Sequence, residues 1–85
     1  MRNKIIITDE NENIILEVEG ESCFKVGEEI DIVIENFAPS VYDVKDKRIY
    51  GTVLRINHYF RYTYGAKSIS KLKVTTVIIK INKVL

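Results

Sequence analysis

A chain of 85 residues suffices for one small domain, residues 1–85, with a single hydrophobic core and little spare stability. Hydrophobic residues make up 46% of the chain and charged residues 29%, which excludes a disordered protein and favours a globular one. No stretch approaches the roughly 20 apolar residues of a membrane span, or the roughly 7–15 of a signal peptide. Cys23 is the single cysteine and can form no internal disulfide. We therefore expect a cytoplasmic protein without membrane contact.

The net charge of +1 hides a strong asymmetry along the chain. Residues 1–35 contain ten acids and three bases, whereas residues 36–85 contain two acids and ten bases. In the simpler interpretation, acidic strands lie beside basic ones and neutralise them across a sheet. In the other, the basic part is one side of a dipolar surface and faces an anionic partner.

Three short strands are predicted before residue 35. Residues 4–8 are rich in β-branched side chains, a polar turn follows, and residues 14–19 resume the strand pattern. The sequence FKVGEEI at residues 24–30 then turns at Gly27 into a strand with apolar residues on alternate positions. This piece resembles the F-x-V-G-D-x-I opening strand of many small barrels, among them SH3-like, OB and PUA/ASCH-type domains. The likeness implies a small barrel and indicates no single family.

Residues 41–48 follow Pro39, which belongs in a loop because it lacks an amide hydrogen. Ser40 and Asp43 have the spacing of a helix N-cap, so a single helical turn is one interpretation of this segment. A charged loop is the other, and it is the one we expect.

One long β-hairpin is predicted over residues 49–83. In residues 50–64 the even positions are largely apolar and the odd positions largely polar, which is the period of a strand. Residues 65–67 then supply a three-residue turn. The apolar positions of the return strand change phase, and this requires an inserted residue, so we expect a β-bulge at Thr75-Thr76.

The register that matches apolar residues on both sides of this bulge follows from the turn. It pairs Tyr64 with Ser68, Phe60 with Leu72, His58 with Val74, Ile56 with Val77, and Leu54 with Ile79. Such a hairpin spans roughly 50 Å at about 3.3 Å per residue, whereas a compact domain of this size is roughly 30 Å across. It must therefore coil around a barrel or project its tip, and a bulge favours bending.

In this register the polar face of the hairpin carries several cations and one aromatic ring. Cations that track phosphates beside rings that stack on bases are typical of single-stranded nucleic-acid grooves. In the alternative, the remaining aromatic residues belong to the core and the lysines protect a strand edge from aggregation. The predicted binding residues are Arg55, Tyr59, Arg61, Lys67, Lys71 and Lys73.

No catalytic or metal-binding motif is recognisable. His58 has no Cys or His partner at metal-ligand spacing, and no local motif activates Cys23. The sequence contains neither a glycine-rich phosphate loop nor a Ser-His-Asp arrangement that could be assigned. We therefore expect no enzymatic activity, no metal site and no cofactor.

These observations predict an all-β domain, a small and partly open barrel of five to six strands in the SH3-like or OB-like class, with a long bulged C-terminal hairpin. The predicted function is a non-catalytic binding module that presents the hairpin face to an anionic partner, either nucleic acid or an acidic protein surface. The alternative is a homo-oligomeric structural or accessory protein of a phage or other mobile element, in which the acidic part of one copy meets the basic hairpin of another. A small enzyme is the third hypothesis, and it would need a pocket with perturbed titratable groups.

Overall fold

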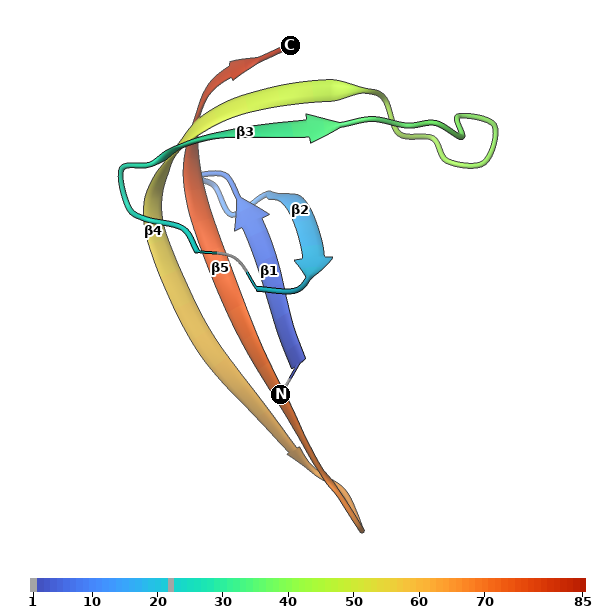
Figure 1. Ribbon diagram of the computed structural model, residues 1–85, viewed down its shortest axis with the longest axis vertical. Coiled ribbons are helices and arrows are strands. Elements are labelled where there is room, and N and C mark those ends of the chain that lie inside the picture. The colour runs from blue at the N-terminus through green and yellow to red at the C-terminus, as the bar shows by residue number, and fades with distance from the viewer. Residues whose placement is uncertain (1, 22) are drawn as a thin grey trace.

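The computed structural model describes residues 2–21 and 23–85, and within these ranges the chain is all-β, which confirms the predicted fold class. The five strands are shown in Figure 1: β1 Arg2–Thr8, β2 Ile14–Glu19, β3 Glu29–Ile34, β4 Lys47–Tyr64 and β5 Ile69–Val84. The described ranges include no helix that is long and apolar enough to cross a membrane.

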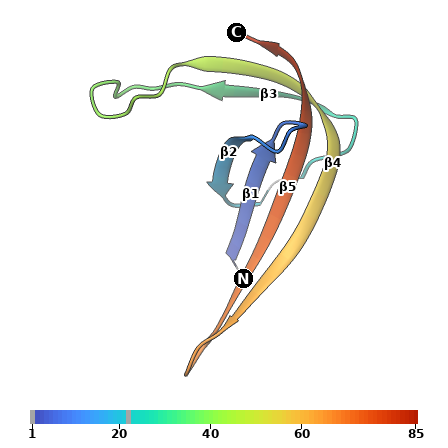
Figure 2. The ribbon, with the colours of Figure 1, turned by 180° about the vertical axis from the view of Figure 1, so that it is seen from behind.

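The strands form one mixed sheet in the order β2-β1-β5-β4-β3. β1 pairs with β5 in parallel, and every other neighbouring pair is antiparallel. The sheet curls into a half-barrel that is open on one side, and β4 and β5 extend beyond it as a hairpin (Figures 1 and 2). The last strand is therefore central in the sheet, and β2 and β3 are its edges.

The hydrophobic core lies on the inner side of the half-barrel. Strand alternation turns Ile5 and Ile7 of β1 to this side, next to Thr75 and Val77 of β5. Among the described residues, the buried cluster consists of Ile5, Ile7, Ile32, Ile49, Val53, Val77 and Ile79. This is a small core for a chain of 85 residues, and many large apolar side chains remain on the surface.

Asp9 organises the turn between β1 and β2. Its carboxylate accepts hydrogen bonds from the backbone amides of Asn11 and Asn13, at 2.8 and 2.9 Å, and from the Asn13 side-chain amide at 3.0 Å. The side-chain bond from Asn13, together with these backbone bonds, lowers the pKa of Asp9. Glu12 completes the turn with a positive φ of 66°.

The register of the hairpin differs from the prediction at its tip. Tyr64 pairs with Ile69 instead of Ser68, because the turn occupies residues 65–68 and closes with a 2.7 Å bond from the Gly65 amide to the Ser68 carbonyl. A turn one residue longer than predicted shifts every pair of the distal hairpin by one position.

The predicted bulge at Thr75-Thr76 is wrong. These residues pair regularly with His58 and Asn57, and the ladder runs without interruption from the turn to the pair of Arg55 and Ile78. The unpaired residues lie nearer the root of the hairpin, at Leu54 in β4 and at Asn82 in β5. Of the predicted apolar pairs, Ile56 opposite Val77 is confirmed.

The error has a physical reason. Register is strongly specified where one face of a strand is buried, and weakly specified where neither face is. Every residue of β4 from Asn57 to Tyr64 is exposed, so β4 offers no buried side chain there to match the buried Val74 of β5. Matching apolar residues therefore does not set the register of the distal hairpin, and the turn does.

The hairpin both bends and projects. The pairing of β4 with β3 ends at Thr52, the bulge at Leu54 follows, and the distal part extends away from the sheet (Figure 1). The molecule measures 48 × 37 × 21 Å and has a radius of gyration of 15.3 Å, whereas a compact domain of this length has one of about 12 Å. We refer to residues 57–76 as the arm; β1 still pairs with β5 at Leu72–Thr76, so only the part beyond Leu72 projects from the sheet.

The connection between β3 and β4 is a loop, as predicted for residues 41–48, although β4 already includes the end of that segment. The Asn36 side-chain amide donates to the carbonyls of Tyr42 and Val44, at 2.9 and 2.7 Å, and so ties the loop together. Phe37 lies in this ordered loop and is nevertheless 90% exposed.

Candidate functional site

The arm has two faces, which its regular ladder defines. Directly paired residues of antiparallel strands point to the same side, and successive residues alternate. The inner face continues the core side of the sheet, since it follows from the pair of Ile56 and Val77. It carries His58, Phe60, Tyr62 and Tyr64 from β4, and Ile69, Lys71, Lys73 and Thr75 from β5.

The six predicted binding residues do not share one face. The pairs of Tyr59 with Val74 and of Arg61 with Leu72 lie on the outer face, and Arg55 lies on that side beside the bulge. The partners of the two lysines are instead inner-face aromatic residues: Lys71 pairs with Tyr62, and Lys73 with Phe60. Lys67 lies in the turn. The prediction of a single charged face is therefore wrong, because the register is shifted by one residue and each shift reverses the side.

The inner face of the arm carries a row of exposed aromatic rings. Phe60, Tyr62 and Tyr64 are 52%, 50% and 75% exposed. Their spacing of two residues corresponds to about 6.6 Å along a strand. Lys71 and Lys73 lie directly across from two of these rings. Cations and aromatic rings thus share this face, whereas the predicted register placed them on opposite faces of the hairpin.

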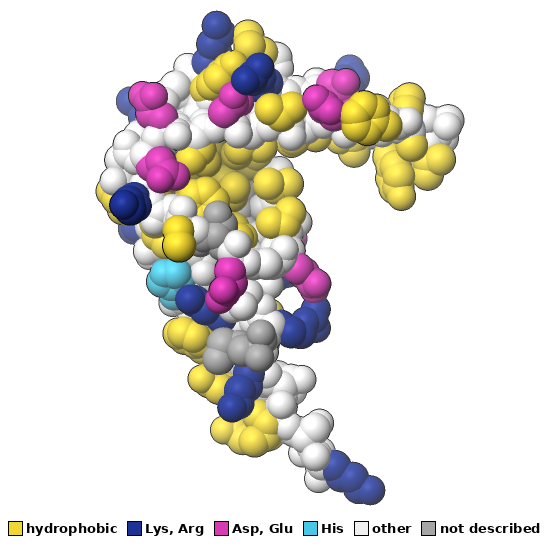
Figure 3. Space-filling model, in the orientation of Figure 1, with side chains coloured by type: hydrophobic (Ala, Val, Ile, Leu, Met, Phe, Trp, Pro, Cys, Tyr) yellow, Lys and Arg dark blue, Asp and Glu magenta, His cyan; other side chains and the backbone are white. Residues whose placement is uncertain are grey.

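The arm is also free of negative charge. Residues 47–85 contain nine lysines and arginines and no acid. The ion pairs found in the described part of the chain join Arg2 to Glu19, Lys4 to Glu17 and Arg48 to Asp31, and none of them includes a cation of the arm, although Arg2 and Lys4 lie beside its Leu72 and Val74. The space-filling view shows the same division, with basic and hydrophobic side chains but no acidic ones on the distal hairpin (Figure 3). Charge neutralisation across the sheet therefore applies to its N-terminal strands and not to the arm.

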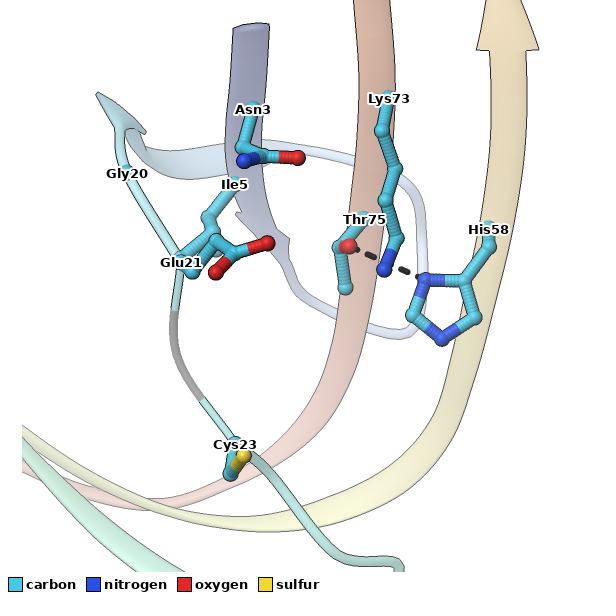
Figure 4. A pocket seen from close by; sticks show the side chains of 8 residues that line it. All are labelled: Asn3, Ile5, Gly20, Glu21, Cys23, His58, Lys73 and Thr75. Atoms are coloured by element: carbon cyan, nitrogen blue, oxygen red, sulfur yellow. Dashed lines mark hydrogen bonds between the residues drawn. The ribbon is translucent and has the colours of Figure 1, made fainter. Parts of the chain in front are cut away.

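A shallow pocket of about 370 Å³ lies where the inner face of the arm meets the half-barrel. His58 from β4, Lys73 and Thr75 from β5, and Asn3 and Ile5 from β1 form its base. The segment after β2 crosses over it and contributes Gly20, Glu21 and Cys23. In Figure 4 the side chains of Asn3, Glu21, Lys73 and His58 point into the same space.

His58 is held at the edge of this pocket. Its Nδ1 lies 3.0 Å from Oγ1 of Thr75, the residue directly opposite it in the ladder. Within residues 2–21 and 23–85, no group of three or more His, Cys, Asp or Glu side chains is arranged to hold a metal ion. The chemistry that the pocket offers is hydrogen bonding and charge.

The perturbed titratable groups lie elsewhere. The Arg48 guanidinium donates hydrogen bonds of 2.6 to 3.1 Å to the Asp31 carboxylate, and these bonds lower the pKa of Asp31 and raise that of Arg48. Both residues belong to the ladder between β3 and β4, at the root of the hairpin. This pair joins the two strands and takes no part in the surface of the arm.

Sequence reasoning missed two sets of residues. The prediction places Phe60, Tyr62 and Tyr64 on the apolar face, as core or interface residues and not as stacking groups. A chain this short cannot bury so many large side chains, and that excess is the signal in the sequence for exposed rings. Asn3 and Glu21 carried no signal, because the parallel pairing of β1 with β5 brings them to the pocket from the other end of the chain. Comparison of the chain with protein-family models, curated proteins and solved structures finds no match.

Proposed function

We propose that this protein is a non-catalytic binding module that holds single-stranded nucleic acid on the inner face of its arm. The observation that supports this function best is the exposed row of Phe60, Tyr62 and Tyr64 with Lys71 and Lys73 across from it. Unpaired bases stack on aromatic rings, and lysines alongside neutralise the backbone phosphates. Beyond Leu72, where the pairing with β1 ends, the arm is two-stranded and exposed, which gives a flexible single strand access to this row.

The absence of acids on the arm supports an anionic partner in general, and the aromatic row favours nucleic acid over an acidic protein surface. A protein surface rich in carboxylates would be attracted by the lysines but has no use for three evenly spaced rings. Each base, by contrast, offers a flat face to a ring, and stacking contributes about 1–3 kcal/mol per base. Duplex nucleic acid keeps its bases stacked internally, so we expect it to bind more weakly than a single strand.

The test compares the two faces of the arm by fluorescence anisotropy with a labelled single-stranded oligonucleotide. Three lysines on the inner face and turn predict a slope of log affinity against log salt of about −2, at roughly 0.7 per neutralised phosphate. In the double variant Lys71→Gln/Lys73→Gln this slope should be less steep by about 1.4. The matched control, Arg55→Gln/Arg61→Gln, removes the same charge from the outer face and should leave the slope nearly unchanged.

Three results would contradict the proposal. If the lysines only protect open strand edges, the inner-face variant binds as the wild type does. Equal losses in both double variants would indicate general charge attraction without a defined face. Binding to polyglutamate, with none to DNA or RNA at low salt, would indicate that the partner of the arm is an acidic protein surface.

A second candidate function, a homo-oligomeric accessory protein, is favoured by the loop between β3 and β4. Hydrogen bonds from Asn36 order this loop, yet Phe37, Val41 and Tyr42 are 90%, 72% and 62% exposed. Burying one such side chain contributes about 1.5–3 kcal/mol. An ordered loop that presents apolar side chains is suited to protein–protein contact, in addition to or in place of the function of the arm.

A further inference from the structure

The arm has a long open strand edge. β4 pairs with β3 as far as Thr52, and two backbone hydrogen bonds of Val53 continue this contact by one residue. Over residues 54–64 this edge of β4 pairs with no strand of residues 2–21 and 23–85, while its other edge pairs with β5. A row of unpaired amides and carbonyls is a template for the addition of another strand.

The composition of this edge favours strand addition. Residues 55–64 are rich in aromatic and β-branched side chains, and they contain neither proline nor lysine, which commonly protect open edges. Their two charges, Arg55 and Arg61, lie on the outer face of the arm, opposite the face of the aromatic row. The edge therefore suits a strand with apolar residues on the inner face and acids on the outer face.

β2 has this pattern and an open edge of its own. It is the last strand on its side of the sheet. Its pairing with β1 sets Leu16 and Val18 beside the core residues of the inner face, and so turns Glu17 and Glu19 to the outer face. In one chain β1 and β5 separate β2 from β4, so the two open edges can meet only between two copies.

The topology fixes the direction of such a pairing. β2 is antiparallel to β1, β1 is parallel to β5, and β5 is antiparallel to β4, so β2 and β4 run in the same direction. A second copy that approaches the arm with β2, and has its inner face on the same side, keeps this direction. The added strand is therefore parallel to β4. A copy turned over would run antiparallel, but it would set its acids beside the aromatic rings.

Side-chain type then selects the register. With Arg61 beside Glu17 of the second copy, the rings of Phe60 and Tyr62 lie beside its Leu16 and Val18. A slip by one residue would move every one of these side chains to the opposite face. Val18 is 41% exposed and Phe60 52%, so both have apolar surface left to bury.

The open edge of β3 fits the arm less well. Its inner-face residue Ile32 is already buried in the core, and its outer-face Asp31 accepts three hydrogen bonds from Arg48. Glu17 and Glu19 also form ion pairs in their own chain, but their side chains remain 42% and 74% exposed. A carboxylate has two oxygens and can accept from a second cation.

We propose that copies of this protein associate edge to edge, with β2 of one copy added in parallel to the open edge of the arm of the next. The two edges differ, so the contact is heterologous, and each copy has one edge of each kind. This association uses the strand edge and leaves the inner face of the arm accessible. It is therefore separate from nucleic-acid binding, and also from contact through the loop between β3 and β4.

The experiment is sedimentation velocity at low and high salt. The wild type should associate at low salt, and high salt should remove this association by screening. Arg61→Glu and Glu17→Lys should each weaken it by about tenfold, because like charges then lie side by side. The combined variant Arg61→Glu/Glu17→Lys restores the opposite charges and should recover it. Arg55→Glu makes the same change on the same face, outside the paired segment, and should leave it unchanged.

Amide hydrogen exchange distinguishes strand addition from a contact of side chains alone. Amides of β2 and of residues 58–63 should exchange more slowly in the associated protein than in the single chain. Unchanged exchange at both edges would overturn strand addition.

The variants supply the other outcomes that would overturn the proposal. These are a wild type that stays a single chain at low salt and high concentration, and a combined variant that fails to recover association. Loss of association in Glu29→Lys, with none in Glu17→Lys, would assign the contact to β3 instead. All these side chains are exposed, and circular dichroism checks that each variant keeps the fold.

Discussion

Gly51 allows β4 and β5 to pack closely at the root of the hairpin. A Cβ at this position would lie 2.8 Å from Cδ1 of Ile79 and 3.1 Å from the Lys80 carbonyl oxygen. Ile79 is fully buried, so moving its side chain would disturb the core, and the Lys80 oxygen belongs to the backbone of the paired strand. Glycine is therefore required here by packing, in a strand that otherwise favours larger residues.

Gly51→Ala should lower the free energy of unfolding by about 1–3 kcal/mol, the usual cost of overpacking a core. Urea unfolding followed by circular dichroism measures this loss. Gly65→Ala is the matched control, since a Cβ there would meet the Ser68 carbonyl at 3.4 Å, an ordinary contact. A loss of stability in the control as large as that in Gly51→Ala would contradict the packing explanation.

At the level of the strands, the arm pairs β4 with β5 throughout and also includes β1 at Leu72–Thr76, and its two faces carry different side chains. On the outer face Tyr59 lies across from Val74, which is 1% exposed, so this ring helps to cover a buried side chain. On the inner face Tyr62 lies across from Lys71 and is half exposed. Tyr59 is itself 45% exposed, so exposure alone does not distinguish the two tyrosines. Under the proposed function, Tyr59 contributes to stability and Tyr62 to binding.

Tyr62→Ala should weaken the binding of a single-stranded oligonucleotide by about tenfold, because one stacking contact is worth about 1–3 kcal/mol. Its melting temperature should stay close to that of the wild type, since the ring is not part of the core. Tyr59→Ala should show the reverse, a lower melting temperature with nearly unchanged affinity. A loss of affinity in Tyr59→Ala and none in Tyr62→Ala would assign binding to the outer face.

The whole molecule is an open half-barrel with two projections, the arm and the loop between β3 and β4. They leave the sheet in different directions (Figure 1). The arm is basic and aromatic, and the loop is apolar at Phe37, Val41 and Tyr42. If both proposed functions hold, this separation would let the arm bind nucleic acid while the loop contacts a second copy.

The second candidate function predicts a mass above the 9.9 kDa of one chain in light scattering with size exclusion. Phe37→Ser/Tyr42→Ser should return the mass to that of a single chain, whereas Ile14→Ser, an exposed apolar residue on β2, should not. Contact through the apolar loop should persist at high salt, while contact between the acidic strands and the basic arm should be lost by screening. A wild type that remains a single chain at high concentration would exclude this candidate.

Local sequence patterns predict the strands and the class of fold correctly. The alternation of apolar and polar residues, the turn residues and the position of Pro39 predict local structure because they act over a few neighbours. Residues 14–19 match β2 completely, and the long hairpin occupies β4 and β5 as expected. The concentration of cations after residue 46 also identified the arm as a candidate contact surface.

Which side chains share a face of the arm, and which residues they contact, depends on the three-dimensional pairing of the strands. The predicted register assumed that apolar residues pair with apolar ones, a rule that holds where a face is buried, whereas β4 is exposed from Asn57 onward. A turn longer by one residue therefore moved Lys71 and Lys73 from the side of Tyr59 to the side of Phe60 and Tyr62. The pocket depends in addition on the parallel pairing of β1 with β5, a contact between the two ends of the chain that no local pattern encodes.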